Sequence, residues 1–174
     1  MKFFFKFIII LLLLVAVFAG AFYGAHQLYP KKYSEFVEKY CAEYEVPTEL
    51  AYAVIKCESG FNPDAESEIG AKGLMQITPE TFDWICTKID SNGIEMTDIN
   101  DPETNIRAGI YLLNLNLKDF DSIEFALAAY HAGRTVTQSW VDEGIKPDDI
   151  PYSDTNAYIK RVMITSKIYS LLYQ

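Results

Sequence analysis

The sequence predicts an all-α fold, or one with minimal β structure, preceded by a single N-terminal transmembrane helix. Apolar residues recur at three- and four-residue steps through most of the 174-residue chain, and alternating strand-like stretches are nearly absent. The first 29 residues are almost wholly apolar, whereas charges are spread throughout the rest. We therefore divide the chain into residues 1–29, a membrane anchor or signal segment, and residues 30–174, one domain with its own core.

Capping residues mark where several helices of the domain begin. Thr78 and Asp101 are good N-caps, and each is followed by a proline at the first helical position. Ser122 caps a shorter helix that ends near Gly133. The expected helices cover about residues 33–44, 47–59, 79–84, 102–117, 123–129 and 155–172.

The N-terminal segment Phe7–Ala25 contains no charged residue and follows Lys2 and Lys6. Its length approaches the roughly 20 residues that one membrane crossing needs, and exceeds the apolar stretch usual in a signal peptide. Small residues at 19–21 leave cleavage by a signal peptidase open. We expect a single-pass membrane protein whose domain lies outside the cytoplasm; the alternative is secretion after signal cleavage.

The charge of the domain restricts its partners. Residues 30–174 hold 24 Asp and Glu but, once Lys2 and Lys6 are set aside, only 13 of the 15 Lys and Arg, which gives a net charge of −11. No basic stripe is apparent that would replace the counterions of phosphates, so the sequence argues against nucleic acid. The net charge also argues against adhesion to anionic lipid. A neutral or cationic substrate fits better.

Cysteine and histidine spacing predicts neither a metal site nor a cofactor. Cys41, Cys57 and Cys86 are far apart, and the histidines are His26 and His131. We favour three small packing residues over metal ligands. One disulfide with a spare thiol stays open for an exported domain.

Glu58 is the candidate catalytic residue. The helix expected from Pro47 to Ser59 places it on the same largely apolar face as Ala51 and Val54. Burial and the negative end of the helix dipole both disfavour a carboxylate there, so its pKa should rise. A carboxyl group that stays protonated near neutral pH can act as a general acid for a leaving alcohol.

Four motifs follow one another along the chain. They are Glu58-Ser59-Gly60-Phe61-Asn62-Pro63, Gly70-Ala71-Lys72-Gly73-Leu74-Met75-Gln76-Ile77-Thr78-Pro79, Ala129-Tyr130-His131-Ala132-Gly133 and Thr155-Asn156-Ala157-Tyr158-Ile159. In this order they resemble the family 1 lytic transglycosylases, the soluble lytic transglycosylase domains of glycoside hydrolase family 23, which share the lysozyme-like fold. The resemblance covers roughly residues 35–172.

The resemblance implies the roles of further residues. The family's catalytic glutamate aligns with Glu58, and its Gly-Leu-Met-Gln segment lines the cleft beside that acid. Tyr130 corresponds to a cleft aromatic residue, and Tyr158 to a late tyrosine near the acid. The expected substrate-binding residues are Ser67, Gly73, Met75, Gln76, Tyr130, His131 and Tyr158.

Two positions depart from the family pattern. His131 stands where the family usually has Asn, and a histidine that titrates near pH 6.5 would make substrate binding sensitive to pH. Asp154 replaces the usual Glu before Thr155. Neither departure alters Glu58.

The implied function is cleavage of the β-1,4 bond between N-acetylmuramic acid and N-acetylglucosamine in peptidoglycan, with a 1,6-anhydromuramyl product. The expected partners are glycan strands and, through the N-terminal helix, the membrane; cell-wall or envelope assembly partners stay open. The alternatives are a goose-type lysozyme-like hydrolase of the same bond and a non-catalytic wall-binding scaffold subunit.

Overall fold

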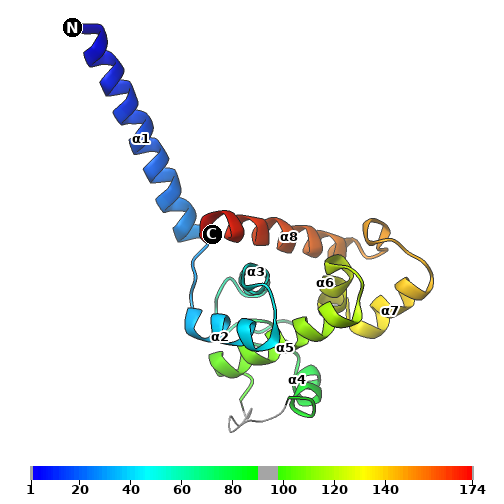
Figure 1. Ribbon diagram of the computed structural model, residues 1–174. Helices are drawn as coiled ribbons and strands as arrows, with labels where there is room; N and C mark the ends of the chain where they lie inside the picture. Colours follow the sequence, from blue (N-terminus) through cyan, green and yellow to red (C-terminus); the bar gives the residue numbers. More distant parts are fainter. Residues whose placement is uncertain (1, 90–97, 174) are drawn as a thin grey trace.

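The computed structural model describes residues 2–89 and 98–173, and in this part of the chain every named element is helical. Figure 1 shows one long helix projecting from a cluster of shorter ones. The elements are α1 (Lys2–Leu28), α2 (Ser34–Tyr44), α3 (Thr48–Glu58), α4 (Pro79–Cys86), α5 (Pro102–Asp119), α6 (Ile123–Ala132), α7 (Arg134–Asp142), a 3₁₀ helix η1 (Pro147–Asp149) and α8 (Ser153–Tyr173). The all-α prediction is therefore confirmed.

The predicted helix starts are confirmed at three N-caps. The side chains of Thr78, Asp101 and Ser122 each accept a hydrogen bond from a backbone N–H three residues later, at 3.3, 2.9 and 3.1 Å. These bonds satisfy N–H groups that have no partner inside the helix. Helices α7 and η1 lie where no helix was expected.

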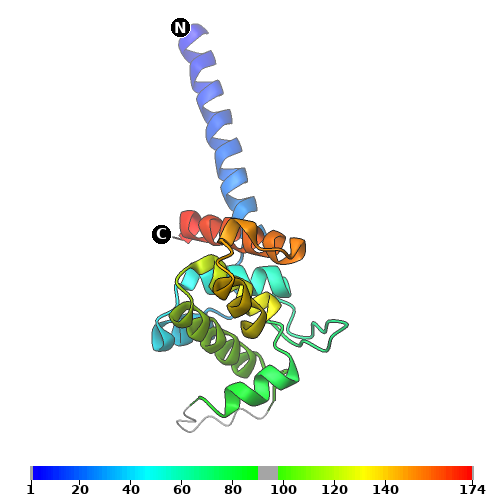
Figure 2. The same cartoon turned by 90° about the vertical axis from the view of Figure 1, so that its right-hand side faces the viewer.

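The domain core forms where α3 packs against α8 and where α5 packs against α2 and α6. Residues 50–55 of α3 are all buried, so this helix runs through the interior. Both views place α8 between α1 and the rest of the domain (Figures 1 and 2). Because α3 lies directly beneath α8, the last residue of α3 is brought to the side chains of α8.

Helix α1 is the one helix among the described residues that is long and apolar enough to cross a membrane, over Phe3–Leu28. It extends away from the domain (Figure 2), and its side chains are exposed over most of its length. The polar domain begins directly after it.

Candidate active site

Glu58 is the last residue of α3, and its position is fixed by the turn that follows. The Ser59 hydroxyl donates to the Leu74 carbonyl over 2.8 Å and accepts from the Phe61 N–H over 3.1 Å. This serine therefore joins the end of α3 to the loop that carries the glycine-rich motif. The Glu58 side chain is half-buried.

Burial raises the pKa of the Glu58 carboxyl from 4.5 to about 7. The nearby Tyr158 hydroxyl and the charge of Arg161 oppose this shift, because both favour the carboxylate. No other carboxylate of the described residues contributes to the shift. The raised pKa that the sequence predicted is thus confirmed, and its main cause is desolvation.

Two tyrosines from different helices flank the acid. Tyr158 of α8 is buried and faces Glu58, but in the described part of the chain its hydroxyl makes no hydrogen bond of ordinary geometry. The Tyr130 hydroxyl of α6 donates to the Met75 carbonyl over 2.8 Å. Burial, reinforced by the charge of Glu58, raises the pKa of both phenols well above 10, so both stay protonated.

Asn105 holds the glycine-rich loop from behind. Its side-chain oxygen accepts from the Met75 N–H over 2.8 Å, and its NH₂ group donates to the carbonyls of Lys72 and Ile99, both over 2.9 Å. The side chain is almost wholly buried. Sequence reasoning missed this residue; the available signal was an amide next to Ile106 at the start of an apolar helix face.

Gly73 and Met75 allow the loop to pack closely against α5. Gly73 has φ +76, and a Cβ atom on it would lie 2.4 Å from the amide nitrogen of Asn105. The Met75 side chain is fully buried and fills the space above Gly109 of α5. The sequence-based expectation made Met75 a cleft wall; the structure places its side chain in the core and its carbonyl at Tyr130.

Gln76 and Ser67 also bond within the loop. The Gln76 NH₂ group donates to the carbonyls of Ala65 and Gly73 over 3.1 and 3.0 Å. The Ser67 hydroxyl accepts from the Ala71 N–H over 3.0 Å and closes the turn at the loop tip. The donor end of Gln76 is therefore occupied by the loop itself.

His131 lies at the C-terminal end of α6, with its ring stacked on Tyr158 at 4.5 Å between centroids. Its Nδ1 is 3.2 Å from the Thr155 hydroxyl. Burial, followed by the charge of Arg161, lowers the pKa of this imidazole, and Asp154 opposes the shift. His131 is thus neutral at pH 7 and contacts the tyrosine that faces Glu58.

Cavities lie on either side of the C-terminal end of α6. One of about 470 Å³ is lined by His131 and by residues 151–155. Another, of about 270 Å³, is lined by Tyr130 and Gly133 together with Trp84 of α4. Tyr130 lines one of these cavities and His131 the other, whereas Glu58 lines neither.

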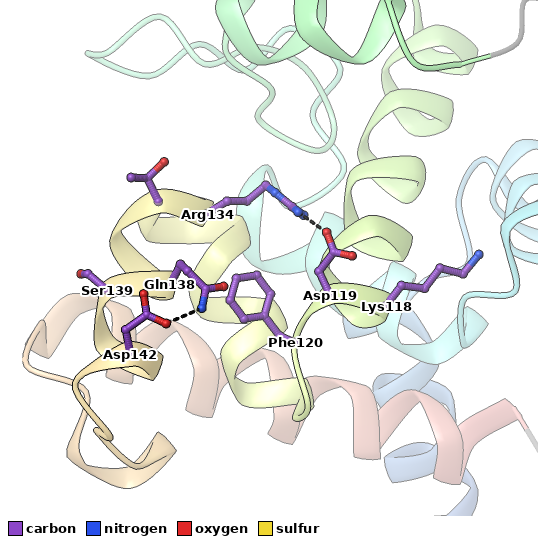
Figure 3. Close-up of a pocket in the computed structure, with 8 residues that line it drawn as sticks. Lys118, Asp119, Phe120, Arg134, Gln138, Ser139 and Asp142 are labelled. Atoms are coloured by element: carbon purple, nitrogen blue, oxygen red, sulfur yellow. Dashed lines mark hydrogen bonds and ion pairs between the residues drawn. The ribbon is translucent and has the colours of Figure 1, made fainter.

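A hollow of about 850 Å³ forms an open groove between the end of α5 and α7. Figure 3 shows Arg134 reaching across to Asp119 and Gln138 bonded to Asp142. None of its lining residues is a predicted site residue. Glu58 does not line this groove either, so the groove is separate from the candidate acid.

Cysteine and metal chemistry find no support at this site. Cys41, Cys57 and Cys86 all lie in the described part of the chain and form no disulfide, and the Cys57 Sγ lies 3.8 Å from the Thr165 hydroxyl. Among residues 2–89 and 98–173, no group of three or more His, Cys, Asp or Glu side chains is placed to hold a metal ion. The acid chemistry of Glu58 is what the described residues offer.

Known proteins resemble this chain in sequence. It is 31% identical over 150 residues to the soluble lytic murein transglycosylase of Escherichia coli K12, which covers 81% of this chain and 23% of the relative. It is 36% identical over 109 residues to the membrane-bound lytic murein transglycosylase F of Histophilus somni, which covers 59% of this chain and 20% of that protein. The chain thus matches about a quarter of the length of these relatives.

Solved structures show the same fold. The 70 kDa soluble lytic transglycosylase of Escherichia coli matches with a TM-score of 0.77 and 29% identity, over 84% of this chain and 25% of the other. The family model of the transglycosylase SLT domain matches residues 35–152, which include Glu58, the glycine-rich loop, Tyr130 and His131. The chain therefore belongs to the transglycosylase SLT domain family.

Proposed function

We propose that this chain is a peptidoglycan lytic transglycosylase that uses Glu58 as its single acid and base. The observation that carries the proposal is a half-buried carboxyl group with a pKa of about 7, which interacts with Tyr158 and Tyr130 and directly precedes the serine that binds the glycine-rich loop. Its substrate would be the β-1,4 bond between N-acetylmuramic acid and N-acetylglucosamine. The family match and the names of the relatives support this assignment.

The reaction would proceed in two proton transfers. Protonated Glu58 gives its proton to the glycosidic oxygen, and the bond from that oxygen to the muramyl C1 breaks. The resulting carboxylate then takes the proton of the muramyl C6 hydroxyl, and the C6 oxygen bonds to C1. The product is a 1,6-anhydro ring, and Glu58 regains its proton for the next cycle.

No carboxylate among the described residues raises the pKa of Glu58, which argues against a retaining hydrolase with a second carboxyl group close to the acid. Most glycosidases use two carboxyl groups, about 5–5.5 Å apart in retaining enzymes and about 6.5–9.5 Å apart in inverting ones. A carboxylate at the shorter distance would raise the pKa of Glu58 through charge repulsion, and none of the described residues does so. A sugar hydroxyl as nucleophile removes the need for that group.

The surrounding residues would position the sugar. The neutral Tyr158 hydroxyl lies beside the acid, and the His131 ring stacks on that tyrosine. Gly73 and Gln76 shape the glycine-rich loop through the hydrogen bond between them, and Ser67 closes the loop tip. The Tyr130 hydroxyl donates to the Met75 carbonyl and so holds this part of the glycine-rich loop in place. Nothing in this scheme requires a metal or an organic cofactor.

Helix α1 would anchor the enzyme as a single-pass membrane protein with its domain outside the cytoplasm, where peptidoglycan lies. The length of α1 and the relatives named membrane-bound support membrane association. A secreted form, cleaved after α1, is the alternative.

The test is the substitution Glu58→Gln, which keeps the size of the side chain but removes its titratable proton. The full chain in detergent would be incubated with purified peptidoglycan, and the released muropeptides measured by mass spectrometry. We expect anhydromuramyl ends from the wild type and from Glu35→Gln, an exposed control on α2, and at least a 1,000-fold loss in Glu58→Gln, about the scale of general acid catalysis.

Each other outcome would point to a different protein. Reducing ends in place of anhydro ends would identify a goose-type hydrolase. Binding of peptidoglycan without cleavage by the wild type would identify a scaffold subunit. A known precedent for the expected loss is an inactive Glu-to-Gln mutant of lytic transglycosylase Slt from Pseudomonas aeruginosa, a structure 26% identical to this chain with a TM-score of 0.74.

A further inference from the structure

Helix α8 carries a row of exposed residues at steps of three and four, so that they share one face. We name this row the outer stripe of α8. Two of its members are large apolar residues in open solvent, Ile164 with 62% and Leu171 with 75% of their surface exposed. The stripe consists of Ala157, Lys160, Ile164, Lys167 and Leu171.

The opposite face of α8 accounts for all of its packing. Tyr158, Ile159, Val162 and Tyr169 are buried, and α8 packs mainly against α3 and α6. The outer stripe therefore contributes nothing to the core. Single exposed apolar residues are common on protein surfaces, so Ile164 and Leu171 gain their meaning from the lysines that share their face.

The charge of α8 has the opposite sign to that of the domain. Helix α8 holds Lys160, Arg161 and Lys167, and its one acidic residue is Asp154 in the first turn, off the outer stripe. Within the described part of the chain, neither lysine forms an ion pair. The net charge of −11 thus conceals one cationic, partly apolar helix face, and that face is complementary to an anionic surface.

The C-terminal end of α8 is fastened to the end of α1. The Tyr173 hydroxyl donates to the Tyr29 carbonyl over 2.7 Å, and the Tyr169 hydroxyl donates to the Pro30 carbonyl over 3.0 Å. The rings of Tyr29 and Tyr169 also meet edge to face at 5.8 Å. The domain therefore follows α1 directly, without a free linker.

This junction determines which face of the domain would meet the membrane. The 27 residues of α1 span about 40 Å, against about 30 Å for the hydrocarbon core of a bilayer. The end of α1, and the α8 terminus bound to it, would then lie at headgroup level. In both views α8 runs across the axis of α1, and α2, α4 and α5 lie on the far side of the domain (Figures 1 and 2).

We propose that the outer stripe of α8 lies on the membrane surface. Ile164 and Leu171 enter the headgroup layer, and Lys160 and Lys167 bind the phosphate groups of anionic lipids. This inference depends on α1 crossing the membrane, as proposed above. Because Tyr158 lies on the buried face of the same helix, docking would hold the active site at a fixed height above the membrane.

The test uses the full chain in lipid nanodiscs made of equal parts phosphatidylcholine and phosphatidylglycerol, with isotope-labelled Ile methyl groups and a gadolinium-labelled lipid headgroup. We expect strong paramagnetic broadening of the Ile164 methyl signal, and little at Ile69 and Ile123, which are exposed elsewhere on the domain. In phosphatidylcholine alone the broadening at Ile164 should weaken.

Charge reversal supplies a matched pair of variants. In Lys160→Glu/Lys167→Glu we expect the Ile164 broadening to fall to the level of Ile123, since each lysine near an anionic surface favours the docked state about fivefold. Lys88→Glu/Lys118→Glu changes the net charge equally at exposed lysines outside α8, and its broadening should match the wild type.

Equal broadening at Ile69, Ile123 and Ile164 would overturn the proposal. So would broadening at Ile164 that is the same in both lipid compositions and in the Lys160→Glu/Lys167→Glu variant. Dependence of the Ile164 signal on protein concentration, with no response to lipid, would assign the stripe to a second copy and equally overturn it. Failure of the chain to enter the nanodiscs would reject the anchor itself. Retained lytic activity in any of these cases would leave the proposed reaction standing.

Discussion

The side-chain amide of Asn105 occupies the space in which a Cβ atom on Gly73 would lie, 2.4 Å from the amide nitrogen. The same amide binds the backbone of Lys72 and Met75 on either side of that glycine. The loop can therefore approach α5 closely only because residue 73 has no side chain. This contact sets the position of the loop opposite Glu58.

Gly73→Ala should accordingly destabilise the fold far more than Gly70→Ala. Both glycines have positive φ, +76 and +78, so alanine at either costs about 1–2 kcal/mol of backbone strain. Only residue 73 adds a collision with Asn105, worth about a further 1–3 kcal/mol. Thermal unfolding of the two full-length variants in detergent measures the difference; equal losses of Tm would show that Asn105 moves aside at little cost.

The pKa of Glu58 should make enzyme activity fall as pH rises. The proposed cycle begins with protonated Glu58, whose pKa is about 7, so kcat/KM should be highest below that pH and fall tenfold per unit above it. Turnover of soluble glycan fragments from pH 5 to 9 would give the profile. An activity that rises from pH 6 to 9 would contradict a protonated resting acid.

The raised pKa of Glu58 should also make the folded protein less stable at neutral than at acidic pH. Its folded value of about 7 exceeds the ordinary 4.5, so the folded chain holds this proton more tightly than the unfolded chain does. Stability is therefore lost as pH rises from about 4.5 to about 7, by about 3 kcal/mol in all. We expect Glu58→Gln to match the wild type near pH 4.5 and to be more stable at pH 8.

Thermal unfolding of the full chain across this pH range tests the linkage. Glu35→Gln is the matched control, because the side chain of Glu35 is exposed. A constant difference in Tm between Glu58→Gln and the wild type at all pH values would mean that the carboxyl group is not desolvated in solution.

The parts of the fold that the sequence predicted are those that local chemistry dictates. Thr78, Asp101 and Ser122 cap helices through bonds to residues three positions away, so their neighbours in sequence suffice to identify them. Glu58 was found for a similar reason, since an acid on an apolar helix face near its C-terminus is unusual wherever the helix packs.

The parts that it did not predict depend on long-range contacts. Asn105 acts on a loop about 30 residues away, and no pattern around residue 105 reveals that loop. Gly133 is both the C-cap of α6 and the N-cap of α7, which follows it directly. In the sequence, this glycine indicates only the end of a helix, so α7 was not predicted. The Met75 side chain could be assigned to the core only once Gly109 was seen opposite it.

Tyr158→Phe should shift the fall in activity at basic pH to a higher pH. The Tyr158 hydroxyl lowers the pKa of Glu58, so its removal leaves the carboxyl group harder to ionise. Because this buried hydroxyl makes no ordinary hydrogen bond in the described structure, its loss should cost little stability. Activity from pH 5 to 9 and the Tm of the same sample measure both effects.

Tyr130→Phe is the matched comparison for that variant. It breaks the 2.8 Å bond to the Met75 carbonyl, at a cost of about 1 kcal/mol, yet the Tyr130 hydroxyl is not among the groups that shift the pKa of Glu58. We expect a lower Tm with the basic limb unmoved, the reverse of Tyr158→Phe. If both variants shifted the limb equally, Glu58 would be responding to general changes in the cleft, and the specific pairing of Tyr158 with the acid would be refuted.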